Sequence, residues 1–335
     1  MVGPVVTVVI PTLNAGPALD DCLAALARQT YREFDIVTVD NSGCGRVRRE
    51  HTLGERTSVI ENPSNAGFGA AANQGFRASA ARYIAVLNDD ATPRPPWLEA
   101  LVGAIESDNG IGMCASRVLL ESGMIDSAGM LIAADGSSKQ RGHGQPAEAW
   151  SAPGDVLLPS GSAALYRRDM LDEVGMFEES FFVYCEDTDL GLRARRAGWR
   201  CVYVPEAIVD HRYSQSAGRA SALKAWYVER NRIRTVIRNL PGRALLRVPF
   251  ATLARYFWHV WFLLKGRGAA AEYSRATGAA SLVWIVVKAH LAGLGDLPRL
   301  LRERRAIQAT ARLSAREFMC LLEQHRISLR EVASL

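Results

Sequence analysis

No two cysteines of this 335-residue sequence form a Cys-x-x-Cys pair, and the six that are present are scattered along the chain. Scattered single cysteines are typical of reduced thiols, so we expect a protein of the cytosol rather than a disulfide-stapled secreted one. We also expect no signal peptide, because Met1 leads almost directly into the strand-like segment 5–10.

The sequence also lacks the common phosphate-binding motifs. It has no Gly-Lys-Ser/Thr, which excludes a P-loop nucleotide site. Its glycine-rich stretch 67–75 does not follow the first predicted strand, so it is not the Gly-x-Gly-x-x-Gly fingerprint of dinucleotide-binding proteins. The segment 10–16, which does follow that strand, contains no Lys or Arg. That absence counts against a sugar-1-phosphate nucleotidyltransferase, an enzyme class that should carry a basic, Gly-rich loop directly after its first strand.

No uninterrupted apolar stretch reaches the length of about 20 residues that a membrane-spanning helix needs. The segment 245–264 comes nearest, but its polar members fall within an arc of about 140° of a helix. These polar members are Arg247, Thr252, Arg255 and His259. A basic stripe beside an aromatic face is typical of a helix that lies in the membrane interface. The alternative is a buried helical subdomain.

Charge is distributed unevenly along the chain. Residues 1–211 contain 18 Lys and Arg against 28 Asp and Glu, whereas residues 212–335 contain 22 against 7. A basic C-terminal region predicts an anionic partner, either nucleic acid or the cytoplasmic leaflet of a membrane. Nucleic-acid binding would call for aromatic residues interleaved with Arg, but here the two kinds segregate. We therefore expect a membrane surface and no nucleic acid as partner.

Strand-like and helix-like segments alternate over the first 110 residues. Strands are predicted at 5–10, 34–39, 57–60 and 83–87, and helices at 17–29 and 70–80. This βαβαβ order predicts an α/β fold with a doubly wound, mostly parallel sheet. Further along, we expect helices at 97–106 and 187–198, strands at 111–119 and 163–166, and short strands and loops over an active site at 123–159.

Two acidic clusters stand where apolar runs stop. Asn88, Asp89 and Asp90 follow the strand 83–87, and the segment Glu186-Asp187-Thr188-Asp189 follows an aromatic run. Carboxylates at strand ends point into the crevice of an open α/β sheet, where ligands bind. One cluster is suited to a divalent metal on a diphosphate, and the other to a general base. A sugar-nucleotide transferase needs this division of labour.

The ends of the other strands carry residues suited to a nucleotide. Thr12 and Asn14 follow the first strand, and Asp40 ends the second, where an acidic residue can accept a hydrogen bond from a base or a ribose. Gly67 and Gly69 allow close backbone approach near the start of a helix, where phosphate is favoured.

Taken together, these segments resemble the inverting GT-A glycosyltransferases of family 2, and the rhamnosyltransferase-like branch best. The matching segments run in the family's order between residues 9 and 211. They are Val9-Ile-Pro-Thr-Leu-Asn14, Val39-Asp-Asn-Ser42, Asn62-Pro-Ser-Asn-Ala-Gly-Phe-Gly69 with Asn73, Leu87-Asn-Asp-Asp90, Ser160-Gly161, Phe182-Val-Tyr-Cys-Glu-Asp-Thr-Asp189 and His211.

The resemblance implies a role for each position. Asp187 would be the base that deprotonates the acceptor hydroxyl, and Asp90 with His211 would hold Mn²⁺ or Mg²⁺. The nucleotide-sugar would be bound by Pro11, Thr12, Asn14, Asp40, Asn65, Gly67, Asn73, Asn88, Asp89, Ser160, Gly161 and Glu186. Asn88 departs from the family, because it occupies the first place of the Asp-x-Asp metal motif and its neutral amide is a poorer ligand than a carboxylate.

The resemblance also implies a domain organisation and a reaction. We expect a catalytic GT-A domain at 1–215 and a helical tail at 220–335 that associates peripherally with the cytoplasmic face of the cell membrane. The reaction would transfer a hexose or deoxyhexose to a polyprenyl-diphosphate-linked glycan in cell-envelope polysaccharide synthesis, with inversion. The first choice of donor is dTDP-L-rhamnose, and a UDP-sugar is the second. The sequence leaves open whether the protein forms a homo-oligomer.

Overall fold

The computed structural model describes residues 4–212 and 221–334 of the chain. The chain divides into two compact units. Unit 1 comprises Met1–Met130 and Gln140–Ser216, and unit 2 comprises Leu131–Lys139 and Ala217–Leu335. Unit 2 thus includes a short segment from the middle of the sequence, which the predicted boundary near residue 215 did not foresee.

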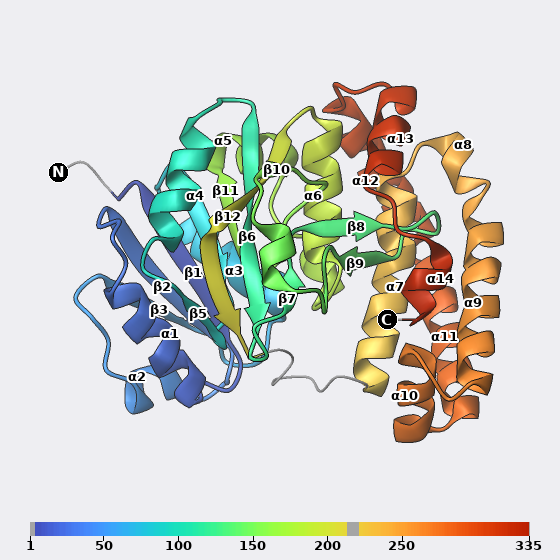
Figure 1. The fold of residues 1–335 in the computed structure, drawn as a ribbon, viewed down its shortest axis with the longest axis horizontal. Helices are drawn as coiled ribbons and strands as arrows, with labels where there is room; N and C mark the ends of the chain where they lie inside the picture. The colour runs from blue at the N-terminus through green and yellow to red at the C-terminus, as the bar shows by residue number, and fades with distance from the viewer. Residues whose placement is uncertain (1–3, 213–220, 335) are drawn as a thin grey trace. The chain divides into compact units, whose positions relative to one another are not determined.

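A ten-stranded mixed sheet forms the centre of unit 1 (Figure 1). Its order is β10-β12-β6-β11-β4-β1-β2-β3, with β5 paired to β12 and β7 paired to β6. The strands β3, β2, β1 and β4 run parallel, whereas β11 is antiparallel to both of its neighbours. The bounds are β1 Val6–Thr12, β2 Phe34–Asp40, β3 Thr57–Glu61, β4 Tyr83–Leu87, β5 Ala91–Pro93, β6 Ile111–Leu120, β7 Ile125–Ser127, β10 Gly154–Asp155, β11 Ala163–Arg167 and β12 Arg200–His211.

Helices cover both faces of this sheet, which confirms the predicted α/β class. Successive side chains of a strand point to opposite faces. In β1, Val8 and Ile10 enter a core with α1 and α4, and Val9 enters a second core with α3 and α6. The helices of unit 1 are α1 Pro17–Ala27, α2 Arg46–Glu50, α3 Phe68–Ala78, α4 Trp97–Glu106, α5 Arg168–Val174 and α6 Glu186–Arg196, with 3₁₀ turns η1 Ala147–Trp150 and η2 Glu179–Phe181.

Unit 2 is helical apart from the hairpin of β8 and β9. The first residue of β8 and the last residue of β9 belong to unit 1. In it, α7 lies against α11 and α12, and α9 lies against α14 and α10. The elements are β8 Met130–Ile132, β9 Ser138–Gln140, α7 Ala222–Asn239, α8 Gly242–Leu245, α9 Val248–Leu264, α10 Ala269–Thr277, α11 Ala279–Gly295, α12 Leu297–Ala309, α13 Ala315–Gln324 and α14 Leu329–Ser334.

The polar stripe of α9 turns in part towards the interior of unit 2, although its member Arg247 is exposed. The association of this segment with a membrane stays a prediction. Thr252 and Arg255 are buried, whereas Phe250 on the opposite face is 74% exposed. The reason is a set of buried charges. The Glu229 carboxylate accepts hydrogen bonds from Arg232, Arg255 and the Tyr256 hydroxyl at 2.5–2.8 Å.

Asp135 completes this buried set of charges. Its carboxylate accepts from Arg255 Nε at 2.5 Å and lies 3.6 Å from Arg232. Although burial favours the neutral acids, the two guanidinium groups lower the pKa of both Asp135 and Glu229. The interior of unit 2 is therefore held partly by ion pairs.

Among the described residues, no single helix is long and apolar enough to cross a membrane. Only α11 and α12 taken together pass that test of length and composition, and they are bent by 62° at their junction.

Candidate functional site

The two acidic clusters meet at the start of β11. The backbone N–H of Asn88, just after β4, donates to the Ser162 carbonyl at 2.9 Å. One residue earlier, the Gly161 N–H donates to Asp187 Oδ2 at 3.0 Å. Because β11 runs antiparallel to β4, its first residues lie beside the last residues of β4. The segment 160–162 therefore links both clusters at one edge of the sheet.

Asp187 lies in the first turn of α6 with its carboxylate fixed in orientation. Besides the Gly161 contact, its Oδ1 accepts from Thr188 N at 2.6 Å and from the Thr188 hydroxyl at 3.2 Å. Burial raises the pKa of Asp187, although these hydrogen bonds oppose the rise. A carboxylate with a raised pKa and a fixed direction is suited to accept a proton.

The chain that leads into α6 has an unusual backbone. Phe182, Tyr184 and Cys185 all have positive φ angles, between 67° and 69°, which are costly for residues with a side chain. The segment is anchored by the Phe182 carbonyl, which accepts from Phe68 N at 2.7 Å. Gly67 makes this approach feasible, because a Cβ there would lie 2.4 Å from that carbonyl oxygen. Gly67 thus contacts the segment before Asp187, which the predicted nucleotide role did not include.

Glu186 is buried beside the proposed base. Burial and the neighbouring Asp187 charge raise its pKa to about 8. Its Oε2 accepts no hydrogen bond from the described residues, which is costly for a buried carboxylate and less so for a protonated acid. Glu186 is therefore a neutral hydrogen-bonding group near pH 7.

Three side chains converge at the other cluster. Asp90 Oδ1 lies 3.1 Å from His211 Nε2, and the Asn88 amide nitrogen lies 3.4 Å from the same His211 atom. In an octahedral site, two neighbouring ligand atoms that are each about 2.1 Å from the ion lie about 3 Å from one another. The distance between Asp90 Oδ1 and His211 Nε2 matches that spacing. Asp90 Oδ1 is buried and faces His211 Nε2, so an ion between the two atoms would take the place of the ring proton.

The charge state of His211 follows from its acidic neighbours. Burial disfavours its protonation, but hydrogen bonds and charges from Asp126 and Asp90 raise its pKa to about 9. The same negative surroundings that hold a proton on the ring favour a divalent cation. Within the ranges that the structure describes, no group of three or more His, Cys, Asp or Glu is arranged to hold a metal by itself. Further ligands would come from Asn88, from water or from substrate oxygens.

Asp89 connects the metal-side cluster to β1. The Thr12 hydroxyl donates to Asp89 Oδ2 at 2.5 Å, and the Ala15 N–H donates to Thr12 Oγ1 at 3.0 Å. Burial and the nearby Asp90 raise the pKa of Asp89, and the Thr12 contact opposes them. Pro11 is buried within β1, while Asn14 is exposed at the end of the strand.

Asp40 and Asn65 are engaged with their own loops. The two Asp40 oxygens accept from Ser42 N at 2.8 Å and from Val47 N at 2.9 Å, and hydrogen bonds of this kind lower the Asp40 pKa against the effect of burial. The Asn65 side chain accepts from Gly67 N at 2.9 Å. Both residues shape the edge of the sheet, and a ligand would use their remaining hydrogen-bonding capacity.

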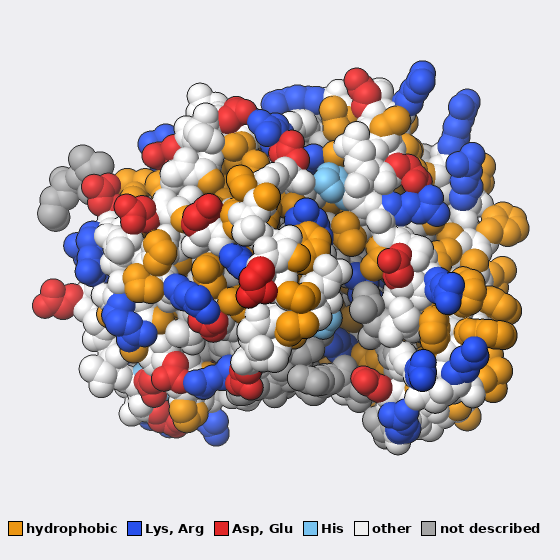
Figure 2. All heavy atoms as spheres, viewed as in Figure 1, with side chains coloured by type: hydrophobic (Ala, Val, Ile, Leu, Met, Phe, Trp, Pro, Cys, Tyr) orange, Lys and Arg blue, Asp and Glu red, His pale blue; other side chains and the backbone are white. Residues whose placement is uncertain are grey.

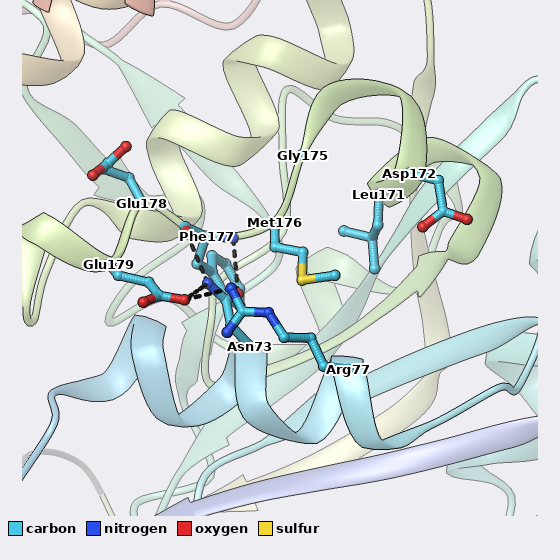
Figure 3. A pocket seen from close by; sticks show the side chains of 9 residues that line it. All are labelled: Asn73, Arg77, Leu171, Asp172, Gly175, Met176, Phe177, Glu178 and Glu179. Atoms are coloured by element: carbon cyan, nitrogen blue, oxygen red, sulfur yellow. Dashed lines mark hydrogen bonds and ion pairs between the residues drawn. The ribbon is translucent and has the colours of Figure 1, made fainter.

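Asn73 uses its side-chain amide for contacts within the protein. Its buried amide donates to the Phe177 carbonyl and to Glu179, both at 2.9 Å, and it accepts from Phe177 N at 3.0 Å. Figure 3 shows these residues around an open hollow of about 520 Å³, to which Arg77 also contributes. Asn73 therefore braces the segment 177–179, which leads towards Asp187, and its amide is used by the protein itself.

The sequence analysis missed two residues that contact the site. Asp126 in β7 accepts from His211 Nδ1 at 2.8 Å. Ser162 supplies the carbonyl that holds Asn88, and its hydroxyl lies 3.0 Å from that of Ser160. Asp126 falls in the Gly-rich region that was predicted to form short strands and loops, and no local pattern there indicated a partner 85 residues away.

Two solved structures have a fold similar to that of this chain. Over 92% of this chain and 86% of the other, the chain superposes with a TM-score of 0.53 and 18% identity on the mannosyltransferase PcManGT from Pyrobaculum calidifontis in complex with GDP-Man and Mn²⁺. A second structure, GalNAc-T7 with UDP, GalNAc and Mn²⁺, superposes with a TM-score of 0.61 at 16% identity. This match covers 76% of this chain and 51% of the other. The fold is that of a GT-A glycosyltransferase.

Sequence comparison gives the family. The profile of Glycosyl transferase family 2 matches residues 7–175, and the chain belongs to that family. It is 30% identical over 243 residues to the N-acetylglucosaminyl-diphospho-decaprenol L-rhamnosyltransferase of Mycobacterium tuberculosis, which covers 65% of this chain and 79% of the relative. It is 29% identical over 225 residues to the pre-mycofactocin glycosyltransferase of the same species, a match that covers 66% of this chain and 46% of the relative. The predicted rhamnosyltransferase-like resemblance is confirmed, and the nucleotidyltransferase alternative has no support.

Proposed function

We propose that the chain is a metal-dependent inverting glycosyltransferase that moves a hexose or deoxyhexose from a nucleoside diphosphate to a hydroxyl of a lipid-linked glycan. The acceptor oxygen forms a bond to the anomeric carbon while the bond from that carbon to the diphosphate breaks. The electron pair leaves with the nucleoside diphosphate, and the hydroxyl proton passes to Asp187. One displacement inverts the anomeric configuration.

The link through residues 160–162 carries this proposal. It joins the Asp187 carboxylate to the end of β4 by two backbone hydrogen bonds, of 3.0 Å and 2.9 Å. A base on one side of the reacting carbon and a diphosphate site on the other require this proximity. Glu186, neutral near pH 7, would donate a hydrogen bond to the acceptor or to the sugar.

Mn²⁺ or Mg²⁺ would be held by Asp90 and His211, with the Asn88 amide within reach. When bound, such an ion neutralises charge that develops on the departing diphosphate. Asp89 and Thr12 would face the donor's sugar or ribose. Mn²⁺ in both solved glycosyltransferases of similar fold is consistent with this assignment.

The nucleotide would lie along the ends of β1 and β2. Asn14 is exposed there, and Asp40 and Asn65 fix the neighbouring loops, so these residues with Pro11 would frame the base and ribose. Ser160 and Gly161 would lie close to the transferred sugar, because Gly161 contacts Asp187 directly. L-Rhamnose from dTDP-L-rhamnose is the first choice of donor, since a rhamnosyltransferase is among the similar proteins.

The acceptor would be carried by a polyprenyl diphosphate at a membrane surface. This is supported by the name of the same relative, which includes a decaprenol diphosphate. Helices α9 and α11 of unit 2 each expose apolar side chains that fit such a surface, and these side chains together are called the apolar face. Exposed large side chains on α9 and α11 are Phe250, Leu253, Phe257, Val260, Trp261, Leu264, Val283, Trp284, Val287, Leu291 and Leu294.

Basic side chains accompany this apolar face. Lys265 Nζ lies 4.6 Å from the Trp261 ring centre, and Lys288 Nζ lies 5.1 Å from that of Trp284. Between residues 240 and 295 the sequence has seven Lys and Arg and one acidic residue, Glu272. Figure 2 shows hydrophobic side chains gathered along one edge of the molecule, at the place where Figure 1 draws α9. Aromatic groups with adjacent cations are suited to an anionic bilayer surface, on which the enzyme would act peripherally.

Thermal unfolding with a panel of nucleotide-sugars tests the donor assignment. A ligand that binds only the folded state raises the melting temperature. We expect dTDP-L-rhamnose with Mn²⁺ to give the largest rise and UDP-sugars a smaller one, and we expect the preferred donor to support transfer to a lipid-linked acceptor with inversion. No rise with any donor, or a retained anomeric configuration, would refute the proposal.

A further inference from the structure

We propose that Asp126 is a positioning residue that orients His211 for the divalent cation. The inference rests on the proposed function, because it concerns the cation that Asp90 and His211 would hold. Asp126 does not reach the cation position in this arrangement; it acts through the far nitrogen of the imidazole ring.

Strand geometry brings the two residues together. Asp126 lies in β7 and His211 at the end of β12, and both strands pair with β6. Val118 of β6 is opposite Ser127 on one side and Val209 on the other. The imidazole and the carboxylate therefore meet across the end of β6, where Nδ1 lies 2.8 Å from Asp126 Oδ2.

The contact decides which ring nitrogen faces the cation. Asp126 carries a carboxylate, so it accepts the Nδ1 hydrogen and leaves Nε2 directed at Asp90 Oδ1, 3.1 Å away. A carboxylate or carbonyl behind a metal-binding histidine commonly fixes the tautomer and the ring orientation in this way. The Asp126 side chain is 2% exposed in unit 1, so water does not compete for the contact.

A second histidine lies beside the Asp126 carboxylate. His143 Nδ1 lies 3.2 Å from Asp126 Oδ1 and 3.0 Å from the Asp126 carbonyl oxygen. Asp90, His211, Asp126 and His143 thus form one line of contacts that begins at the proposed cation position and ends in the turn before η1.

The first test measures the affinity of the protein for Mn²⁺ alone by electron paramagnetic resonance. Asp126→Asn and Asp126→Leu are compared with Asp210→Asn. Asp210 is the residue before His211 and pairs with Arg94 in a half-exposed ion pair, so its variant removes the same charge one residue away. We expect Asp126→Leu to raise the Kd for Mn²⁺ about 10–100-fold. Asp126→Asn should have a smaller effect, and Asp210→Asn should stay within about twofold of wild type.

The second test needs no variant at the Asp126 position. In ¹⁵N-histidine NMR spectra with saturating Mg²⁺, the wild-type His211 ring should carry its hydrogen on Nδ1, with the signal assigned by its loss in His211→Gln. A purely structural role for Asp126 would not require this tautomer.

The outcomes separate the two proposals. If wild type binds no Mn²⁺, the cation assignment fails and this inference fails with it. If wild type binds Mn²⁺ and His211→Gln weakens it, but both Asp126 variants bind as wild type does, only the role of Asp126 is overturned. If the Asp126 variants do not fold, the NMR spectrum of wild type decides. A His211 ring that carries its hydrogen on Nε2 in the presence of Mg²⁺ would overturn the role of Asp126.

Discussion

Unit 1 and unit 2 differ in what they bury. Unit 1 encloses the apolar residues of its strands between two helical layers and also buries one ion pair, Asp189 with Arg193 in α6. Unit 2 encloses Glu229, Arg232 and Arg255, and it exposes aromatic and aliphatic side chains. Of the large hydrophobic side chains that are exposed in the described part of the chain, only Leu13 belongs to unit 1.

This contrast teaches that amphipathicity alone does not tell which face of a helix is inside. Exposed apolar residues scattered over a surface need no explanation, but a gathered set marks a site of interaction. Removal of buried ion pairs would test the interior of unit 2, and removal of carboxylates at strand ends would test the chemistry of unit 1. Each prediction below separates the two units.

The largest effect is expected at the proposed base in unit 1. Asp187→Asn keeps the shape of the side chain but cannot accept the hydroxyl proton, so the transfer rate should fall about 10²–10⁴-fold. Nucleotide affinity, measured by calorimetry, should remain within about twofold. Asp169→Asn, an exposed acid in the first turn of α5, is the matched control. A loss of nucleotide binding together with transfer would mean that Asp187 has a structural role.

The next effect concerns the interior of unit 2. Glu229→Gln leaves Arg232 and Arg255 with reduced counter-charge, and removal of one partner from a buried pair costs about 3–5 kcal/mol. Unfolding of unit 2, followed by the fluorescence of its tryptophans, should occur at lower denaturant. Glu323→Gln, which removes the exposed ion pair with Arg326, should cost less than about 1 kcal/mol. Equal effects of the two variants would contradict the role given to the buried charges.

The exposed apolar face should control membrane binding with a somewhat smaller effect. Replacing Phe250, Trp261 and Trp284 by Ser removes side chains that are each worth up to about 1.5–3 kcal/mol when fully buried. We expect at least a tenfold weaker association with vesicles that contain anionic phospholipid, measured by flotation. Leu223→Ser, at an exposed site of α7, should have little effect. Undiminished binding of the triple variant would exclude this face as the docking site.

The last prediction is a pH dependence at Glu186. Its pKa in the folded protein is raised from 4.5 to about 8, so the stabilisation from its protonated form is complete below about pH 4.5 and is lost as the pH rises to 8. Glu186→Gln mimics the neutral acid at every pH. Its melting temperature should equal that of wild type near pH 4.5 and exceed it at pH 8. A difference that does not change with pH would show that folding does not shift the pKa of Glu186.

Local sequence patterns predicted the strands and the acidic clusters well, for a physical reason. Continuous apolar runs such as 83–87 form buried parallel strands, and acids placed directly after them can only lie at the sheet edge. The antiparallel strand β11 brings Gly161 beside Asp187, but strand order is set by packing over long range and left no local mark.

The roles of single polar side chains were harder to predict. Asp40 and Asn73 have the residue types of ligand contacts, yet both use their hydrogen bonds on backbone groups nearby in space. Asp126 contacts His211 only because β7 and β12 share a neighbour. The inward direction of Arg255 depends on Glu229 and Asp135, which come from other segments of unit 2. Such pairings depend on tertiary structure, which periodicity does not encode.

The most direct test of the account is the environment of Mn²⁺ bound together with UDP or dTDP, measured by pulsed electron paramagnetic resonance. We predict coupling of the ion to one histidine nitrogen and to phosphorus, retained in Asp187→Asn and without the nitrogen coupling in His211→Gln. Bound Mn²⁺ that shows no nitrogen coupling in wild type, or that keeps it in His211→Gln, would contradict the assignment of the cation to Asp90 and His211.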